Sequence, residues 1–238
     1  MIKVSNLYVE YTDKTVALNG IDITIENEKC VGIIGANGAG KSTLLSSLMG
    51  LVPIKKGEIE IDGTVSCKKT ISDIRRKMGM VFQNPDDQLF MPTVWEDLMF
   101  APKNYGTDTE KAETYAYEIL EMLDISHLKQ RLTHKLSWGE KRKIAIACVL
   151  MLQPSIILLD EPTSFLDPKS RTNLMKLLEK LDCTKIITTH DLDMAWDICD
   201  RIIIIKDGKK AADGSPDELL KNKTLLEECN LELPLKFR

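Results

Sequence analysis

Residues 35–42 read GANGAGKS, between the apolar run CVGIIG at 30–35 and the segment STLLSSLMG at 42–50. The spacing matches G-x-x-x-x-G-K-[ST], a glycine-rich loop that joins a strand to a helix and binds phosphate with its backbone N–H groups. A chance match in a glycine-bearing turn is the alternative, but the flanking strand and helix are the context that the motif needs. The stretch therefore predicts an α/β fold that holds a nucleotide at the end of a strand.

The residues of this loop have distinct chemical tasks. Its glycines permit a tight turn, and the helix that follows directs its positive end at the phosphates. Lys41 can reach the β- and γ-phosphates, and the Ser42 hydroxyl can bind Mg²⁺. The residues expected to contact the nucleotide are Gly35, Asn37, Gly38, Ala39, Gly40, Lys41, Ser42 and Thr43.

A second part of the site is expected where the apolar segment SIILLDE at 155–161 ends in two acids. Asp160 would hold Mg²⁺, usually through water, and Glu161 would orient and polarise the attacking water. Side chains alternate along a strand, so these neighbours point in different directions, as two different tasks require. The alternative is a strand end with solvated acids, which the phosphate loop elsewhere in the chain disfavours.

The elements around these two motifs predict how the chain is organised. Alternating segments at 3–11, 21–25 and 57–63 indicate an N-terminal antiparallel β subdomain, with Asn19-Gly20 as a turn. Strands are expected at 78–83, 155–161, 185–189 and 201–206, with helices at 168–181 and 191–199 and a hairpin at Asp207-Gly208. Helical periodicity at 93–103, 110–129 and 139–152 predicts an inserted helical subdomain. The expected division is a mostly parallel core at 1–83 and 154–214, a helical subdomain at 84–153, and a C-terminal helical tail at 215–238.

The composition limits the class of protein. The chain has 238 residues, of which 43% are hydrophobic and 29% charged, as in a folded domain with a subdomain. A net charge of −4 does not favour nucleic-acid binding, and six cysteines without a CxxC pair favour reduced thiols. No segment resembles a signal peptide or an apolar run of roughly 20 residues, so any membrane role is expected to depend on partner chains.

Five segments occur in the order found in ATP-binding cassette (ABC) ATPases, and the resemblance covers essentially the whole chain. The segments are GANGAGKSTLL, VFQNPDDQLF, LSWGEKRKIAIA, IILLDEPTSFLDP and TTHDLDMAWDICDRIIIIKDGK. The resemblance implies a P-loop ATPase that hydrolyses ATP with Mg²⁺. It also implies two subunits, identical or different, that face each other head to tail and enclose two ATP molecules. Each ATP would contact the phosphate loop of one subunit and the LSGGQ-type signature of the other.

The resemblance assigns roles to residues that would otherwise be ordinary. Gln83 would contact Mg²⁺ or the attacking water and relay motion to a membrane partner, although a strand-end glutamine explains it equally. Asp167 would contact the opposite subunit, and a helix N-cap is a compatible explanation. His190 would read the γ-phosphate. Tyr11 would stack on adenine, with Val16 beside it.

The signature segment LSWGEKRKIAIA, at 136–147, has two explanations. Ser137 and Glu140 have the spacing of a capping box, which would only begin a helix. By resemblance, Ser137 and Gly139 would instead bind the terminal phosphate of a nucleotide held by another subunit. Trp138 and Glu140 depart from the usual glycine and glutamine, which implies tighter packing at this helix start.

Within the family, VFQNPDDQLF and the C-terminal NLELPL most resemble the ATPases of energy-coupling factor (ECF) importers, which take up trace metals such as cobalt and nickel, or vitamins. The implied partners are a second ATPase subunit, a transmembrane coupling subunit and a substrate-binding membrane subunit, with the chain peripheral on the cytoplasmic face. Residues 84–90, an acidic turn followed by Leu89 and Phe90, would dock a basic helix of a membrane partner; a solvated loop over a small core is the alternative.

Three other functions remain as alternatives. The chain could serve another importer or an exporter, although no fused spans are present in the sequence. It could be a soluble ABC protein of DNA repair or translation, which usually carries coiled-coil insertions, zinc cysteines or a second cassette. It could also be a regulatory module that binds but does not hydrolyse ATP, which Glu161 and His190 disfavour.

Overall fold

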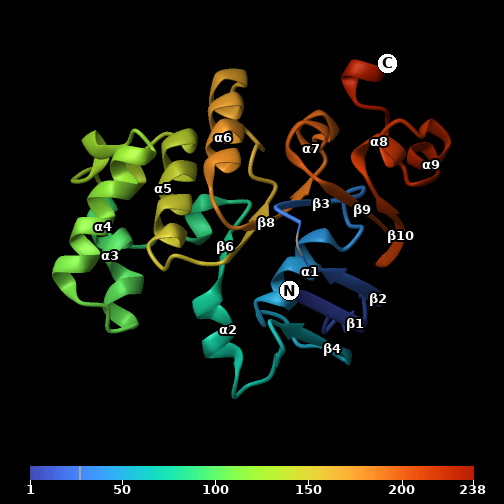
Figure 1. Cartoon of the computed structure of the whole chain (residues 1–238), viewed down its shortest axis with the longest axis horizontal. Coiled ribbons are helices and arrows are strands. Elements are labelled where there is room, and N and C mark those ends of the chain that lie inside the picture. Colours follow the sequence, from blue (N-terminus) through green and yellow to red (C-terminus); the bar gives the residue numbers. More distant parts are fainter. Residues whose placement is uncertain (27) are drawn as a thin grey trace.

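A computed structural model describes residues 1–26 and 28–238, and within them there are two β-sheets, the smaller of which lies at the lower right of Figure 1. The larger sheet has the order β10–β9–β3–β8–β7–β6, and its neighbours are parallel except that β10 runs antiparallel to β9. The smaller sheet, β2–β1–β4–β5, is antiparallel. The predicted α/β fold with an N-terminal antiparallel part is therefore confirmed. The strands are β1 (Ile2–Glu10), β2 (Val16–Ile25), β3 (Cys30–Ile34), β4 (Lys56–Ile61), β5 (Thr64–Val65), β6 (Met78–Val81), β7 (Ile156–Asp160), β8 (Thr184–Thr189), β9 (Arg201–Lys206) and β10 (Lys209–Gly214).

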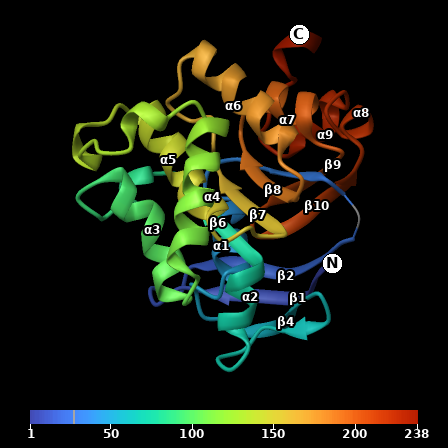
Figure 2. The same ribbon diagram turned by 60° about the vertical axis from the view of Figure 1, so that its left-hand side comes forward.

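The helices cover these sheets in distinct groups. Helices α3, α4 and α5 form a lobe at the left of Figure 1, and Figure 2 shows α6, α7 and α9 over one face of the larger sheet. Helix α1 packs between the two sheets, in a core that contains residues of both. The helices are α1 (Lys41–Leu48), α2 (Ile71–Lys77), α3 (Val94–Asn104), α4 (Thr109–Met122), α5 (Trp138–Leu150), α6 (Pro168–Lys180), α7 (Leu192–Ile198), α8 (Pro216–Leu219) and α9 (Lys223–Glu228).

The larger sheet separates two hydrophobic cores. In β7, Ile156 and Leu158 belong to the core shared with α1 and the smaller sheet, whereas Ile157 and Leu159 belong to the core under the helices. This alternation follows from the period of two in a strand, and both sets are buried because both faces of the sheet are covered. A continuous apolar run thus becomes a strand that ends at the buried Asp160.

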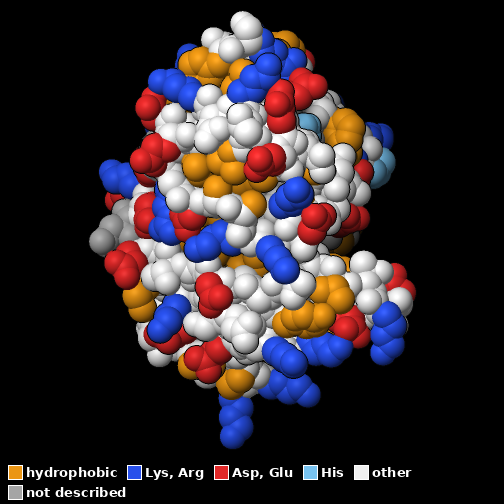
Figure 3. Space-filling view, turned by 90° about the vertical axis from the view of Figure 1, so that its right-hand side faces the viewer, with side chains coloured by type: hydrophobic (Ala, Val, Ile, Leu, Met, Phe, Trp, Pro, Cys, Tyr) orange, Lys and Arg blue, Asp and Glu red, His pale blue; other side chains and the backbone are white. Residues whose placement is uncertain are grey.

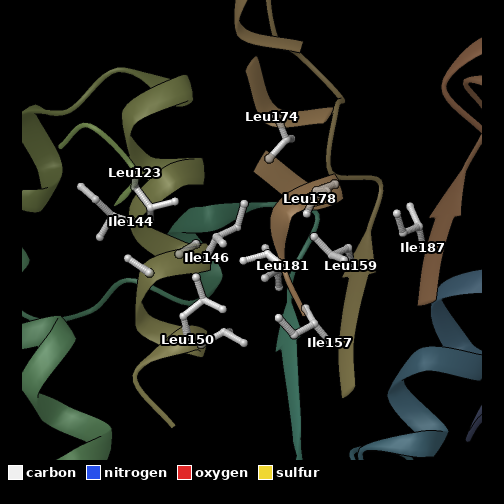
Figure 4. Packing of buried hydrophobic residues seen from close by; sticks show 14 of the residues in the cluster. Leu123, Ile144, Ile146, Leu150, Ile157, Leu159, Leu174, Leu178, Leu181 and Ile187 are labelled. Atoms are coloured by element: carbon white, nitrogen blue, oxygen red, sulfur yellow. The ribbon is translucent and has the colours of Figure 1, made fainter. Parts of the chain in front are cut away.

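Helix α5 connects the helical lobe to this sheet. Figure 4 shows Ile146 of α5 directed toward the side chains of β7 and α6, and Ile144 on the other side of the helix near Leu123, all within one core. The residues labelled there are Leu123, Ile144, Ile146, Leu150, Ile157, Leu159, Leu174, Leu178, Leu181 and Ile187. Burying each such side chain contributes about 1.5–3 kcal/mol relative to leaving it exposed. This packing therefore fixes the start of α5, near residue 137, relative to the end of β7, near residue 160.

Two local predictions were wrong. Asn19-Gly20 lies inside β2, where a register shift near Gly20, with φ +75°, replaces the predicted turn. The helix predicted for 110–129 ends at Met122, because Asp124 adopts φ +55° and a 3₁₀ turn follows at Ser126–Leu128. The predicted helical tail contains two short helices, α8 and α9, each opened by its own cap. The hairpin predicted at Asp207-Gly208 is confirmed, since it joins β9 to the antiparallel strand β10, whereas helix α2 and strand β5 were not predicted.

The exterior mixes charges of both signs. The face in Figure 3 carries lysine and arginine side chains interspersed with aspartate and glutamate. This distribution follows from 32 basic and 36 acidic residues in the chain.

Candidate active site

The phosphate loop follows β3 and leads directly into α1, which begins at Lys41. A Cβ atom on Gly35 would come within 2.3 Å of the Ile205 carbonyl oxygen, so only glycine permits this approach to β9. Gly40, the N-cap of α1, has φ +107°, which other residues rarely adopt. The two glycines therefore allow the loop to turn so that the N-terminal N–H groups of α1 are available to an anion.

Lys41 is 7% exposed, and its ammonium group is held inside the loop. Its Nζ donates to the carbonyl oxygens of Gly35 at 2.8 Å and Ala36 at 3.2 Å. It also lies 3.8 Å from Glu161 Oε1. A lysine in this place puts a localised positive charge between the loop and the acids at the end of β7.

Ser42, Asp160 and Thr188 form a connected set of oxygen atoms. Ser42 Oγ donates to Asp160 Oδ1 at 3.0 Å, and Thr188 Oγ1 donates to the same oxygen. Thr188 is the register partner of Asp160 on the adjacent strand β8, so this contact follows from the sheet. A hydroxyl and a carboxylate at hydrogen-bonding distance are the kind of oxygen ligands that Mg²⁺ takes, and the donor set therefore fits the predicted metal.

Glu161 lies just after β7 and is held in an unusual backbone conformation. Its φ is +45°, and its N–H donates to the Thr188 carbonyl oxygen at 3.0 Å and to Thr188 Oγ1 at 3.2 Å. The side chain is 5% exposed, and its Oε2 lies 2.8 Å from His190 Nδ1 and accepts the His190 N–H at 3.3 Å. A non-glycine residue with positive φ is strained, and such residues cluster at functional sites.

Burial raises the pKa of the Glu161 carboxyl, while the positive charges of His190 and Lys41 act in the opposite direction. A carboxyl with a raised pKa releases its proton at higher pH, so this group has more affinity for a proton than an exposed glutamate. A buried carboxylate beside a histidine can thus accept a proton from water.

A pH prediction follows from this arrangement. His190→Ala removes a charge that lowers the pKa of Glu161, so the pKa rises further and the basic form is reached only at higher pH. We expect the acidic limb of the pH–rate profile to lie at higher pH in His190→Ala than in the unaltered protein, in addition to a lower maximal rate. ATPase rates between pH 5 and 9 measure this limb. A shift to lower pH, or none, would contradict the coupling of the two groups.

A cleft of about 640 Å³ joins these residues to the predicted adenine contacts. Its described lining includes Tyr11, Val16, Gln83, Glu161 and His190, together with loop residues Asn37, Gly38, Gly40, Lys41, Ser42 and Thr43. Tyr11 and Val16 are both about 40% exposed (43% and 41%), and Tyr11 Oη lies 2.8 Å from Thr43 Oγ1. Gly35, Ala39 and Asp160 are not among the described residues that line the cleft, although Asp160 accepts a hydrogen bond from Ser42, which does line it.

Several residues of this cleft were not predicted from the sequence. Thr15, Ala17, Ser164 and Phe165 line it, and Thr188 supports Asp160 from behind. The segment TTH at 188–190 offered a signal for Thr188, because parallel neighbouring strands end at the same edge of the sheet. Nothing in the pattern indicated the other four.

Ser137, Gly139 and Asp167 are not among the described residues that line the cleft. Ser137 begins α5 in a complete capping box: its Oγ accepts the Glu140 N–H, and its own N–H and hydroxyl donate to Glu140 Oε2 at 2.7 Å. Asp167 caps α6, accepting from the N–H groups of Lys169 and Ser170. Hydrogen bonds from Ser170 lower the pKa of Asp167. Ser137 and Asp167 thus both act as helix caps in this chain. A phosphate contact of Ser137 would require a nucleotide held by another subunit.

Trp138, the departure from the usual glycine, packs against the segment after Glu161. Its Nε1 donates to the Ser164 carbonyl oxygen at 3.3 Å, and its ring meets Phe165 edge-on with centroids 5.4 Å apart. Phe165 is 78% exposed and has φ +63°. The start of α5 is therefore packed onto a segment that also lines the cleft.

Comparisons with known proteins agree with this geometry. The family model described as "ABC transporter" matches residues 18–164. The chain is 41% identical to the energy-coupling factor transporter ATP-binding protein EcfA of Methanosphaera stadtmanae, over 98% of this chain and 86% of that one. It superposes on the structure of cbiO1 from Clostridium perfringens, part of the ABC transporter complex cbiONQ, with a TM-score of 0.83 and 36% identity, over 96% and 94% of the two chains. It also superposes on the dimeric cassette MJ0796 bound to ADP and Pi, with a TM-score of 0.82 and 30% identity, over 91% and 99%.

The chain belongs to the ABC transporter family. It is the ATP-binding and ATP-hydrolysing subunit of a transporter, with relatives among ECF ATPases. Such subunits work with a second ATPase and with membrane subunits. In the described part of the chain, no helix is both long enough and apolar enough to cross a bilayer.

Proposed function

We propose that this chain hydrolyses ATP at the cytoplasmic face of the membrane to drive an ECF-type importer of a trace metal ion, such as cobalt or nickel, or of a vitamin. The observation that carries the ATPase part is the contact network of Lys41, Glu161 and His190, with Ser42 and Asp160 beside it. The importer part is supported by whole-length similarity to EcfA and cbiO1.

In this proposal the cleft binds ATP through its loop and positions it for attack by water. The N–H groups at the start of α1 and the Lys41 ammonium bind the β- and γ-phosphates. Ser42, Asp160 and Gln83 would hold Mg²⁺, which supplies charge neutralisation at the phosphates when bound. Tyr11 stacks on the adenine ring, with Val16 beside it.

Glu161 is the general base. Its buried carboxylate accepts a proton from the attacking water, since burial raises its proton affinity. The 2.8 Å contact with His190 keeps the carboxylate in one orientation. His190, which is exposed at the cleft, contacts the γ-phosphate of bound ATP. The orientation of the Glu161 carboxylate therefore depends on whether ATP is present.

A second ATPase subunit, identical or different, completes each site. The Ser137 hydroxyl and the Gly139 N–H of one subunit bind the γ-phosphate at Lys41 of the other, and Asp167 contacts the opposite subunit. The helical segment 84–153, which carries Ser137 and Gly139, moves as one body during closure. A helix start suits this task because it presents N–H groups and a positive dipole end.

Lys41→Ala tests the nucleotide site. We expect ATP affinity to fall by at least tenfold and hydrolysis to be lost, because the phosphates lose their closest side-chain cation. Isothermal titration with ATP and an ATPase assay measure the two effects. Lys56→Ala, at an exposed position of β4, is the matched control. Normal ATPase rates in Lys41→Ala would contradict the assignment.

The proposed docking loop has a more specific geometry than the sequence indicated. Leu89 is 8% exposed and not available to a partner, contrary to the prediction, whereas Phe90 is 63% exposed and packs edge-on against Phe100 with centroids 4.7 Å apart. Asp86 forms an ion pair with Lys141 at 2.5 Å, and Asp87 accepts from Asn84 Nδ2 at 3.2 Å. Asp87 and Phe90 are therefore the better candidates for contact with a basic amphipathic helix.

Combining Asp87→Lys with Phe90→Ala should weaken association with the membrane subunits at least tenfold, while ATPase activity of the isolated chain stays within twofold. The loss follows from one reversed charge and one removed apolar contact. Co-purification from detergent-solubilised native membranes measures association, and Glu113→Lys, an exposed charge reversal on α4, is the control. Unchanged recovery of membrane subunits would contradict the docking site.

A further inference from the structure

Arg142 is a buried cation on α5, five positions after Ser137. Its side chain is among the largest that are fully buried, with 1% exposure. Its Nη1 donates to the Phe82 carbonyl oxygen at 2.6 Å, and its Nη2 donates to the Gln83 carbonyl oxygen at 2.6 Å. Among residues 1–26 and 28–238, no ion pair within 4.0 Å includes Arg142, and its Nε has no hydrogen-bond partner.

Such an arginine costs stability that an apolar side chain would not. Burial lowers the pKa of Arg142 to about 10, and the charge of Asp160 acts in the opposite direction, so the group is charged at neutral pH. A buried charge without a paired carboxylate is unfavourable, and an unpaired buried donor adds to the cost. The compensating contacts are two charge-assisted hydrogen bonds to consecutive carbonyl groups, which the planar guanidinium fork reaches at once.

These bonds hold the main chain at Gln83, which lines the cleft just after β6. Other contacts fasten the same segment to the same helix. Gln88 Oε1 accepts the Phe82 N–H at 3.3 Å, and Gln88 Nε2 donates to the Ala145 carbonyl oxygen at 2.7 Å. Residues 82–88 are thus attached to α5 by side chains at both ends of the segment. Among the side chains that the structure describes, only that of Arg142 donates to the Gln83 carbonyl oxygen.

We propose that Arg142 is a positioning residue that fixes Gln83 of the cleft relative to Ser137 and Gly139 of the signature. The proposal rests on the roles proposed above for Gln83 and Ser137. When α5 moves to place its N-terminus on a nucleotide of the second subunit, Arg142 moves Gln83 with it. Closure at one composite site therefore sets the position of Gln83 in the other. The hydrogen bonds from Arg142 to the Phe82 and Gln83 carbonyl oxygens transmit this motion, rather than contact of Arg142 with ATP.

Arg142→Met tests the proposal in the full-length chain. Removing both hydrogen bonds should lower kcat by about tenfold or more. KM for ATP should stay within twofold, because the loop residues that bind ATP are unaltered. Lys143→Met is the matched control: it removes the adjacent cation of α5, whose Nζ donates to the Leu123 carbonyl oxygen within the helical lobe. This control should keep kcat. A wild-type kcat in Arg142→Met, or an equal loss in Lys143→Met, would overturn the proposal.

A double-mutant cycle with Gln83→Ala separates positioning from general damage. If Arg142 acts through Gln83, Arg142→Met should cause no further loss of kcat in the Gln83→Ala background. Additive losses would overturn the inference while leaving the role of Gln83 intact. A normal kcat in Gln83→Ala alone would instead overturn the role of Gln83, and the inference with it.

Arg142→Lys keeps the test decisive if Arg142→Met does not fold. Lysine retains the buried charge but lacks the rigid fork, so it cannot hold both carbonyl groups in the same geometry. We expect a kcat below that of the unaltered protein, again with KM within twofold. A kcat equal to that of the unaltered protein would show that hydrogen bonds to both carbonyl groups are unnecessary and would overturn the proposal.

Discussion

Glu161→Gln is expected to bind ATP, to lower the hydrolysis rate by at least two orders of magnitude, and to accumulate as a closed dimer. General-base catalysis contributes about 10²–10⁴-fold to rate, and the amide keeps the shape of the side chain but cannot take the proton from water. Because the change leaves Lys41 and Ser42, the proposed ATP contacts, unaltered, nucleotide binding should continue. The subunit then remains in the state that precedes hydrolysis.

Two measurements check this expectation. An ATPase assay gives the rate, and light scattering with and without ATP should show the mass rise from that of the 26.9 kDa chain to that of a dimer. Glu179→Gln, an exposed change on α6, is the control and should behave as the unaltered protein. Turnover at the unaltered rate in Glu161→Gln would refute its role as the base.

Ser137→Asp is the second change with a large expected effect. Aspartate caps a helix as well as serine, so α5 should remain folded. If Ser137 contacts the γ-phosphate of a second subunit, a carboxylate in its place repels that phosphate. ATPase activity should then fall to background, although ATP binding at Lys41 of the same chain is retained. Nucleotide titration and an ATPase assay on the same preparation measure the two properties.

The capping box itself supplies the controls for this variant. The Ser137 hydroxyl and N–H both bond to Glu140, and these bonds lower the pKa of that carboxyl, so an aspartate at 137 would also face the Glu140 charge. Combining Ser137→Asp with Glu140→Gln removes this repulsion, and Glu140→Gln alone is its reference. Ser137→Asn caps the helix without a charge and should retain most of the activity. If the aspartate and asparagine variants are equally active, Ser137 is only a cap.

The sequence predicted the parts of the site that depend on short-range patterns. The loop at 35–42 and the acids at 160–161 are recognisable because strand, turn and helix signals lie next to one another. The same locality explains the capping box at Ser137 and the N-cap at Asp167. The helix at 110–129 was extended too far because its periodicity continues through Asp124, which the fold places at positive φ.

What the sequence could not predict depends on contacts between distant segments. Thr188 supports Asp160 because β8 and β7 are neighbours in register, and Trp138 meets Phe165 because α5 packs beside β7. In the sequence, Lys141, Arg142 and Lys143 form a basic run of the kind that usually covers a solvated helix face, yet Arg142 is 1% exposed and donates to the segment that follows β6. A run of charged residues in a sequence does not indicate which of those residues the fold buries.

Mixing two inactive variants tests the central claim most directly, namely that each nucleotide is bound between the phosphate loop of one subunit and Ser137 of another. A dimer of Ser137→Asp with Lys41→Ala has one composite site with both residues intact and one with both altered. Each variant alone should be inactive, and the mixture should recover part of the ATPase activity. A mixture as inactive as its components would contradict the shared site, as would a Ser137→Asp protein with normal activity on its own.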